Sequence, residues 1–225
     1  MIQIENVSVH GWEPTIRGMR NPMNSWDKSD SEFFPELKLG ENDLKLALSL
    51  SKAGPDHSKF LRYITVTVDV DAPLYWWKEF KTYRAGRKFL DNEPELFSDP
   101  ELFEQDIEIN SCSTMHKIHT KPFDINDFSH EHLRSMAFNS LEATIHVMNH
   151  YRQLYLIDKE KSAWWQLIQL LPSSYNQRRT VQLNYAVLRN MYHARKNHKL
   201  DEWRIFCGWM ECLPYSELIT GEAKK

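Results

Sequence analysis

The chain has 225 residues, of which 41% are hydrophobic and 12% aromatic, and this is enough apolar material for one sizeable core. Its net charge of -3 excludes the overall positive field of a dedicated nucleic-acid-binding or membrane-surface protein. No apolar run reaches the length of a membrane span, and the first residues, MIQIENVSV, do not resemble a secretory signal, so we expect a cytoplasmic protein without nucleic-acid or membrane partners.

Apolar and polar residues alternate in two stretches of the first third of the chain, and each stretch predicts a strand. Residues 2–9 alternate imperfectly, with a slip near Asn6. Residues 63–70 alternate regularly and carry β-branched side chains on one face, which is typical of a half-buried strand. A helix over 74–84 is predicted to follow directly after a proline.

Between these strands we expect a long loop and a leucine-rich helix. Residues 11–35 are rich in Asn, Ser, Asp and Pro, which indicates a loop, interrupted by a short helix at Thr15–Arg20. The two arginines of this short helix either reach an anion or are solvated. Asn42 or Asp43 is in position to cap the leucine-rich helix that follows.

The middle of the chain predicts an acidic insertion and a pair of helices. Residues Asp91–Glu108 contain the near-duplicate PELF twice together with prolines, so we expect a surface insertion rather than a repeat architecture. Ile107 and Ile109 predict a resumed strand. Helical spacing continues from 133 to 156, and a shorter helix then ends near Leu171.

The stretch 170–203 has the most informative pattern. Its S-x-x-Q spacing at 174–177 is that of a capping box and predicts a helix from there onward. One face of that helix is apolar except for Asn184 and Arg195, and Asn190 lies beside the face. A buried polar group costs about 1–3 kcal/mol unless it finds a partner, so these side chains either bind a ligand or pair with neighbouring loops.

The remaining motifs give little support for a metal or nucleophile site. His146 and His150 have the i, i+4 spacing of helical metal ligands, but no third ligand stands at supporting spacing, and a solvated face is the alternative. The three cysteines are an odd number without a C-x-x-C, which indicates reduced thiols. No G-x-G-x-x-G, P-loop or G-x-S-x-G occurs, and we expect no metal.

Three segments together resemble the flavin-dependent thymidylate synthase (ThyX) family. From His57 to Arg84 the order is a histidine, a strand, Ala-Pro, an amphipathic helix and Tyr-Arg. Residues 110–116, Asn-Ser-Cys-Ser-Thr-Met-His, resemble the second half of that family's signature, RHRxxSxNxxSxRY, with the acidic insertion between the halves. From Gln169 to Arg195 the chain matches the family's Leu-Pro and its spacing of Asn, Asn and Arg.

The resemblance implies a fold, an activity and an assembly. The fold would be α+β, a mainly antiparallel sheet flanked by helices, in a single domain over 1–225 with the insertion at about 91–108. The activity would be FAD-dependent methylation of dUMP to dTMP, with methylenetetrahydrofolate and a reduced nicotinamide cofactor, NADPH, as co-substrates. The assembly would be a homotetramer that binds dUMP or a related pyrimidine nucleotide.

The resemblance also implies two sets of site residues. Those that would bind the flavin cofactor are His57, Tyr83, Arg84, Asn184 and Asn190. Those that would bind the nucleotide are Ser113, Gln169 and Arg195. The residue types suit this chemistry, because amides match the donor and acceptor edge of a flavin ring and a guanidinium can hold pyrimidine carbonyls.

The signature departs from the family pattern at several positions. RHR reads Thr-Tyr-Arg at 82–84, and two nucleotide-binding arginines read Met115 and Gln169. Losing a charge-assisted contact to phosphate costs more than losing a neutral hydrogen bond. The alternative interpretation is therefore a catalytically inactive, phage-type interaction protein that keeps the ThyX scaffold. Cations that could replace the two arginines are Arg87, Lys88, Lys117 and Arg178.

Overall fold

A computed structural model of the protein describes residues 1–83 and 107–221. The predicted insertion at Asp91–Glu108 lies outside the described residues except for its last two positions, and Arg84 lies outside them as well. The contacts between residues divide the chain into two compact units, and the expectation of one domain stays a prediction. Unit 1 comprises Met1–Gln3, Asp69–Lys81 and Asn110–Thr180, and unit 2 comprises Ile4–Val68, Thr82–Ile109 and Val181–Lys225.

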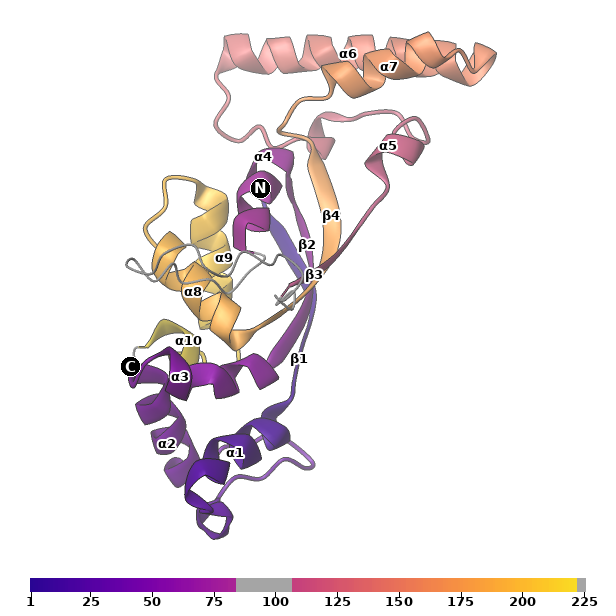
Figure 1. Ribbon diagram of the computed structural model, residues 1–225. Coiled ribbons are helices and arrows are strands. Elements are labelled where there is room, and N and C mark those ends of the chain that lie inside the picture. The colour runs from indigo at the N-terminus through magenta and orange to yellow at the C-terminus, as the bar shows by residue number, and fades with distance from the viewer. Residues whose placement is uncertain (84–106, 222–225) are drawn as a thin grey trace, which may run out of the picture. The chain divides into compact units, whose positions relative to one another are not determined.

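A four-stranded sheet with the strand order β1-β2-β4-β3 is the central element of the fold (Figure 1). Its strands are β1 (Gln3–His10), β2 (Thr65–Pro73), β3 (Glu108–Ser111) and β4 (Asn176–Asn184). The predicted α+β class with a mainly antiparallel sheet and flanking helices is confirmed. Asn6 has a positive φ of 52° inside β1, which is the slip that the imperfect alternation indicated.

Helices account for most of the remaining described residues. The α-helices are α1 (Trp12–Arg20), α2 (Glu41–Lys52), α3 (Pro55–Ser58), α4 (Leu74–Phe80), α5 (Thr114–Lys117), α6 (Ser135–Asp158), α7 (Lys161–Leu170), α8 (Tyr185–Arg195), α9 (Asp201–Glu211) and α10 (Glu217–Thr220). The 3-10 turns are η1 (Asn21–Met23), η2 (Trp26–Lys28), η3 (Lys59–Tyr63), η4 (Lys81–Tyr83) and η6 (Ile125–Asp127). Over 1–83 and 107–221, no helix combines the length and apolar character needed to cross a membrane.

The predicted helix from 174 onward is wrong in its first half, because Asn176–Asn184 form strand β4. Val181 and Leu183 are buried and alternate with exposed neighbours, which is the period of a strand. Helix α8 begins only after Asn184, whose side-chain Oδ1 accepts a hydrogen bond of 3.0 Å from the Val187 N–H. The capping residue is therefore Asn184, ten residues later than predicted.

Unit 1 has a core of large apolar side chains. Helices α6 and α7 lie side by side in Figure 1, and they contribute to a buried cluster with the loop before α6. The buried members of this cluster are Ile118, Phe123, Phe128, Leu141, Ile145, Met148 and Leu167. A second aromatic group in unit 1 comes from α4, where Trp76, Trp77 and Phe80 are in ring contact.

Unit 2 buries α8 between neighbouring helices. Leu188 and Met191 of α8 are fully buried, as are Trp203 and Phe206 of α9, whose rings pack edge to face. Tyr185 is also buried, and its hydroxyl donates a 2.6 Å hydrogen bond to the Pro214 carbonyl. These contacts fix the orientation of α8, and hence of the polar side chains at its two ends.

Arg20 belongs to a buried network in unit 2, so neither anion binding nor solvation describes it. Its Nε lies 2.6 Å from Asp43 Oδ1, and the hydroxyls of Ser29 and Ser31 each donate to Asp43 Oδ2 at 2.7 Å. Burial alone would raise the pKa of Asp43. The hydrogen bonds from Ser31, Ser29 and Arg20 and from the Asp30 N–H outweigh burial and lower it.

The start of α2 also differs from the prediction that Asn42 or Asp43 caps it. The N-cap residue is Gly40, which has no side chain to donate or accept. Instead, the carboxylate of Asp30 accepts hydrogen bonds from the backbone N–H groups of Asn42 and Asp43, at 2.9 and 3.0 Å. A cap from a distant loop has no local sequence signature, which is why spacing alone did not reveal it.

Candidate functional site

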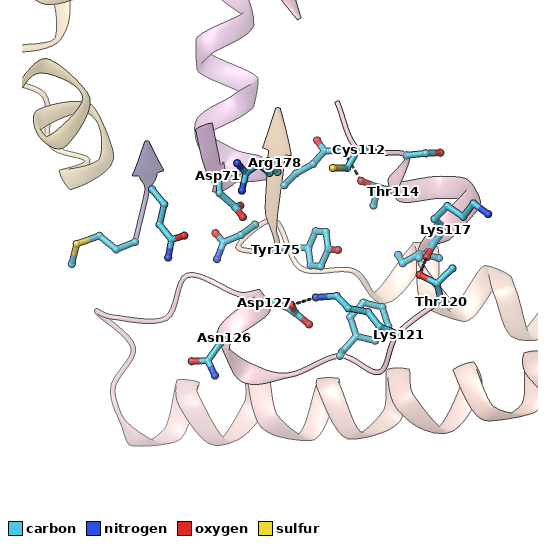
Figure 2. A pocket seen from close by; sticks show the side chains of 17 residues that line it. Asp71, Cys112, Thr114, Lys117, Thr120, Lys121, Asn126, Asp127, Tyr175 and Arg178 are labelled. Atoms are coloured by element: carbon cyan, nitrogen blue, oxygen red, sulfur yellow. Dashed lines mark hydrogen bonds and ion pairs between the residues drawn. The ribbon is translucent and has the colours of Figure 1, made fainter. Parts of the chain in front are cut away.

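A polar cavity of about 560 Å³ lies within unit 1 and is a candidate site (Figure 2). Its walls come from the start of β1, Asp71 of β2, the two residues between β3 and α5, helix α5, the segment between α5 and α6, and the start of β4. Tyr175 lies near its centre in the figure, with Asp127 and Lys121 on one side and Asp71 and Arg178 on the other. Ser113, which the sequence predicted as a nucleotide contact, also lines this cavity.

Strand β4 positions Ser113 through its neighbours in the chain. The side-chain Nε2 of Gln177 donates a 2.9 Å hydrogen bond to the Cys112 carbonyl and a second bond to Thr114 Oγ1. The Cys112 N–H donates to the backbone carbonyl of Arg178 at 3.2 Å. Ser113 is thus held on both sides by a sheet strand, and its Oγ lies 3.0 Å from His116 Nδ1.

A buried arginine holds the side chain of Gln177 in place. Arg179 is 7% exposed and donates two hydrogen bonds to Gln177 Oε1, at 3.0 and 2.7 Å. Its guanidinium lies 4.3 Å from the centroid of the Trp77 ring, and the Trp77 Nε1 donates 2.9 Å to the Gln177 carbonyl. A charge placed over an aromatic face and satisfied by two hydrogen bonds can remain buried. Arg179 also lines an adjoining cavity of about 390 Å³ together with Lys81 and His116.

The cavity contains several cations with different surroundings. Lys121 Nζ lies 2.6 Å from Asp127 Oδ1, and the hydrogen bond to Asp127 raises the pKa of Lys121, against the opposing effect of burial. Arg178 lies 3.0 Å from Asp69, which also accepts a hydrogen bond from a threonine hydroxyl of β4. Lys117 is exposed on α5. A ligand that carries an anionic group could therefore be met by up to three cations.

Tyr175 gives the cavity an aromatic wall. Its ring packs edge to face against Phe128 and Phe123, with centroids 5.6 and 6.3 Å apart. Burial raises the pKa of the Tyr175 phenol, and the nearby Asp127 carboxylate raises it further, so the phenol is a neutral donor near pH 7. Cations, hydroxyls and a fixed aromatic ring together suit a phosphorylated ligand with a planar base.

A second group of polar side chains lies within unit 2, at the end of α8. Arg195 Nε donates a 2.7 Å hydrogen bond to the Tyr83 hydroxyl. Its guanidinium lies 5.4 Å from the centroid of Tyr83 and 5.0 Å from that of Trp203. The structure therefore brings together two residues that the resemblance had assigned to different ligands, Tyr83 to the flavin and Arg195 to the nucleotide.

The other predicted residues are more scattered. Asn184 is buried, and its Oδ1 is used in capping α8, while Asn190 is exposed on the same helix. His57 is exposed on α3, and Gln169 is exposed on α7 and is not among the residues that line the cavity of Figure 2.

Sequence reasoning missed Tyr175, Lys121 and Asp127 as cavity residues. Lys121 lies in a loop, Asp127 in the short 3-10 turn η6 and Tyr175 at an isolated β-bridge, and elements this short have no periodicity to recognise. The one local signal is the D-x-x-D spacing at 124–127, which forms a capping box around η6 and fixes the backbone beside Asp127. Within the part of the chain that the structure describes, no group of three or more His, Cys, Asp or Glu side chains could hold a metal ion.

Comparison with solved structures identifies the class of fold: over nearly its whole length, the chain has the fold of the flavin-dependent thymidylate synthases. Two similar structures are of ThyX from Helicobacter pylori with FAD and dUMP. One has a TM-score of 0.67 and 12% sequence identity and covers 98% of each chain, and the other has 0.65 and 13% and covers 99% of each.

A third similar structure is a UMP/dUMP methylase, PolB from Streptomyces cacaoi, bound with 5-Br dUMP. Its TM-score is 0.61 at 13% identity, covering 98% of this chain and 94% of that chain. No protein-family model matches the sequence, and no curated protein matches it. The likeness therefore lies in the fold.

Proposed function

We propose that this protein binds FAD and a pyrimidine nucleotide and acts as a thymidylate synthase-like methyltransferase. The observation that carries the proposal is the match in fold along 98% of the chain to proteins crystallised with FAD and dUMP. The predicted Ser113 lines a polar cavity with an aromatic wall, which gives independent support.

In the proposal, the cavity of unit 1 receives the phosphorylated end of the nucleotide. Lys117 and Arg178 supply the cations that the sequence lacks at Met115 and Gln169. Ser113 donates its hydroxyl to a phosphate oxygen, and the ring of Tyr175 flanks the base. A single strong charge-assisted contact is worth about 1.5–3 kcal/mol, so two such cations can offset the loss of the family's arginines.

The flavin part of the proposal depends on the polar side chains of unit 2. The exposed amide of Asn190 offers both a donor and an acceptor, which suits the polar edge of an isoalloxazine ring. The phenol of Tyr83 belongs to the same unit and, by resemblance, is a second member of the flavin-binding set. When bound, the flavin would supply two-electron redox chemistry. By resemblance, the flavin-binding set also includes His57, Arg84 and Asn184.

The proposed reaction converts dUMP to dTMP, with methylenetetrahydrofolate as the one-carbon donor and NADPH as the reductant. The proposed assembly is a homotetramer, again by resemblance. A diverged relative that binds flavin and nucleotide without turnover, or an inactive interaction protein that keeps the scaffold, is the competing interpretation. The departures at Met115 and Gln169 are the observation that favours it.

Ligand titration tests the proposal directly. Purified protein should show a flavin absorption spectrum or bind added FAD at micromolar concentration, and calorimetry should detect dUMP binding that Lys117→Ala weakens about tenfold or more. Lys45→Ala, which removes an exposed lysine of α2, is the matched control and should bind as wild type does. If the protein binds neither FAD nor dUMP, the proposal is overturned. If it binds them but forms no dTMP, the competing interpretation of a catalytically inactive protein holds.

A further inference from the structure

Another cavity, of about 330 Å³, lies in unit 2 and takes no part in the proposed function. It is formed by helix α1 and the segment that follows this helix, and we call it the α1 pocket. Its lining includes Glu13, Ile16, Arg17, Arg20, Trp26 and Phe33. None of its described lining residues belongs to the flavin or nucleotide sets. Small-molecule sites measure roughly 300–1,000 Å³, so a pocket of this size favours a compact ligand.

The walls of the α1 pocket are mostly apolar, and an exposed tryptophan contributes to them. Ile16 is 3% exposed, whereas Trp26 is 51% exposed. The Trp26 Nε1 donates a 2.9 Å hydrogen bond to Asn21 Oδ1, so the indole is held in place although about half of its surface is in water. An aromatic side chain that is already ordered loses little conformational entropy when a ligand packs on it. The pocket is therefore pre-organised for an apolar group.

A buried arginine holds the segment before Trp26 against α1. Arg20 Nη1 donates a 3.2 Å hydrogen bond to the Ser25 carbonyl, and Arg20 Nε lies 2.6 Å from Asp43 Oδ1. Arg20 lines the α1 pocket, but its charge is already paired with Asp43. Among the lining residues that the structure describes, the cation left for a ligand is Arg17.

Glu13 and Arg17 place opposite charges on the exposed side of α1. They are four residues apart, which brings their Cβ atoms to about 5–6 Å on one face of the helix. Both side chains are exposed, and both line the α1 pocket. Within residues 1–83 and 107–221, neither side chain makes a hydrogen bond or an ion pair. A ligand in the pocket therefore meets one carboxylate and one guanidinium beside an apolar wall.

We infer that the α1 pocket binds an aromatic α-amino acid in its zwitterionic form. The ring packs against the apolar wall of Ile16, Trp26 and Phe33. The ammonium group pairs with Glu13, and the carboxylate pairs with Arg17. An aromatic carboxylate without an amine brings its charge beside Glu13, and an aromatic amine without a carboxylate brings its charge beside Arg17. Like charges at close range oppose binding, so a ligand that carries both charges is favoured over either.

Tryptophan fluorescence and calorimetry test whether the pocket binds such a ligand. L-Phenylalanine does not emit in the tryptophan band, and it should change the protein's emission saturably at millimolar concentration or below. The chain has eight tryptophans, so Trp26→Phe identifies the source: the emission change should disappear while calorimetry still detects binding. L-Alanine carries the same charges without the ring and should not bind. If L-phenylalanine does not bind at up to about 20 mM by either method, the inference is overturned.

Two analogues of phenylalanine, each lacking one charge, test the two charge contacts separately. N-acetyl-L-phenylalanine keeps the carboxylate, and L-phenylalaninamide keeps the ammonium group. Arg17→Gln should weaken binding of the N-acetyl compound about two- to fivefold and leave the amide unchanged or bound more tightly. Glu13→Gln should do the reverse. If each variant weakens both analogues equally, or weakens neither, the two charge contacts do not exist and the inference is rejected.

Matched variants separate these effects from a general loss of structure or charge. Arg62→Gln and Glu36→Gln change exposed residues outside the pocket and should bind every probe as wild type does. Trp26→Ala should weaken phenylalanine and both analogues alike, about tenfold, because all three share the ring. Benzyl alcohol has a similar ring and no charge. If it binds as tightly as phenylalanine, the pocket is an apolar docking site for another partner and the inference is overturned.

The inference and the proposed function can fail separately. FAD and dUMP titrations of Trp26→Ala should match those of wild type, because the α1 pocket shares no described residue with the proposed sites. Phenylalanine binding without FAD or dUMP binding would remove the proposed activity and leave the α1 pocket as assigned. Binding of FAD and dUMP without any response to phenylalanine would remove the amino-acid site alone.

Discussion

Two ion pairs in this protein have the same length and opposite surroundings. Arg20 and Asp43 lie 2.6 Å apart, and their side chains are 5% and 0% exposed. Lys121 and Asp127 are also 2.6 Å apart, but Lys121 is 68% exposed. Because the distances are equal, the pairs differ in the type of cation, in their exposure to solvent and in the other groups around them.

The comparison separates a charge that holds the fold from a charge that is available to a ligand. Asp43 already accepts hydrogen bonds from two serines and a backbone N–H, so the Arg20 network is closed. Lys121 pairs with Asp127 and keeps 68% of its side chain exposed. An exposed pair contributes about 0–1 kcal/mol, whereas breaking a buried pair costs about 3–5 kcal/mol. Burial, rather than charge or pairing, decides which cation can take part in binding.

Breaking the buried pair should give the largest effect on stability. Asp43→Ala leaves the Arg20 guanidinium buried without its carboxylate, and we expect the free energy of unfolding to fall by about 3–5 kcal/mol. Denaturant titration measures it. The control is Asp27→Ala, at an exposed carboxylate of η2, which should change stability by less than about 0.5 kcal/mol. If Asp43→Ala lowers the free energy of unfolding by less than about 1 kcal/mol, the buried network does not stabilise the fold as proposed.

In the ligand-free protein, acid should weaken the Arg20–Asp43 pair. The pKa of Asp43 is lowered below 3.8 in the folded protein, so its contribution is complete above about pH 4 and is lost as the pH falls through the lower, folded value. The difference in unfolding free energy between wild type and Asp43→Asn should be constant from about pH 7 to 5 and shrink below about pH 4. A difference that shrinks near pH 6 instead would point to another titrating group.

The hydrophobic pattern of the sequence predicted most of the regular elements of this fold but missed strand β4. Strand β2 and helix α6 show clear two- and 3.6-residue patterns because their buried faces are apolar. Strand β4 also alternates, but two of its inward positions are Gln177 and Arg179, which are buried by hydrogen bonds and by the Trp77 ring. A polar inward face cannot be recognised without the partners that satisfy it.

The candidate site divides in the same way. The family resemblance assigns Ser113 to the nucleotide, and Ser113 is among the residues that line the cavity; its role as a nucleotide contact stays a prediction. Lys121, Asp127 and Tyr175 could not be named, because they meet only when the segment before α6 folds back on the start of β4. The contact with Tyr175 is tertiary, and the Lys121–Asp127 pair forms within one loop, so no periodic pattern marks either of them.

Arg195 is half-buried, so its exposure lies between that of Arg20 and that of Lys121. Its replacement should therefore have an intermediate effect on the free energy of unfolding. Its guanidinium stacks near Tyr83 and Trp203, which lysine cannot reproduce, so Arg195→Lys should lower the stability by about 0.5–1 kcal/mol. If the planar fork also holds a pyrimidine, nucleotide affinity should fall by about 1.5–3 kcal/mol, ten- to a hundredfold.

Thermal melting and calorimetric titration with dUMP, run on the same sample, separate the two effects of Arg195→Lys. Arg204→Lys, at an exposed arginine of α9, is the control and should change neither quantity. Unchanged nucleotide affinity together with reduced stability would leave Arg195 as a packing residue of the aromatic pair.

The exposed pair should give the smallest change in stability and the clearest separation between folding and binding. Lys121→Ala removes a cation that is mostly in water, so the free energy of unfolding should fall by less than about 1 kcal/mol. If the cavity of Figure 2 receives an anionic ligand, the same change should weaken dUMP binding several-fold, and more strongly at low salt, because screening reduces the contribution of an exposed charge. Asp127→Asn sharpens the test: it removes the carboxylate charge beside Lys121, keeps an oxygen that can accept the Asp124 N–H of the η6 capping box, and should strengthen anion binding. Calorimetry at two salt concentrations measures the dUMP affinity of both variants. If Lys121→Ala and Asp127→Asn both weaken, or both strengthen, dUMP binding, the pair affects the ligand only through the shape of the cavity.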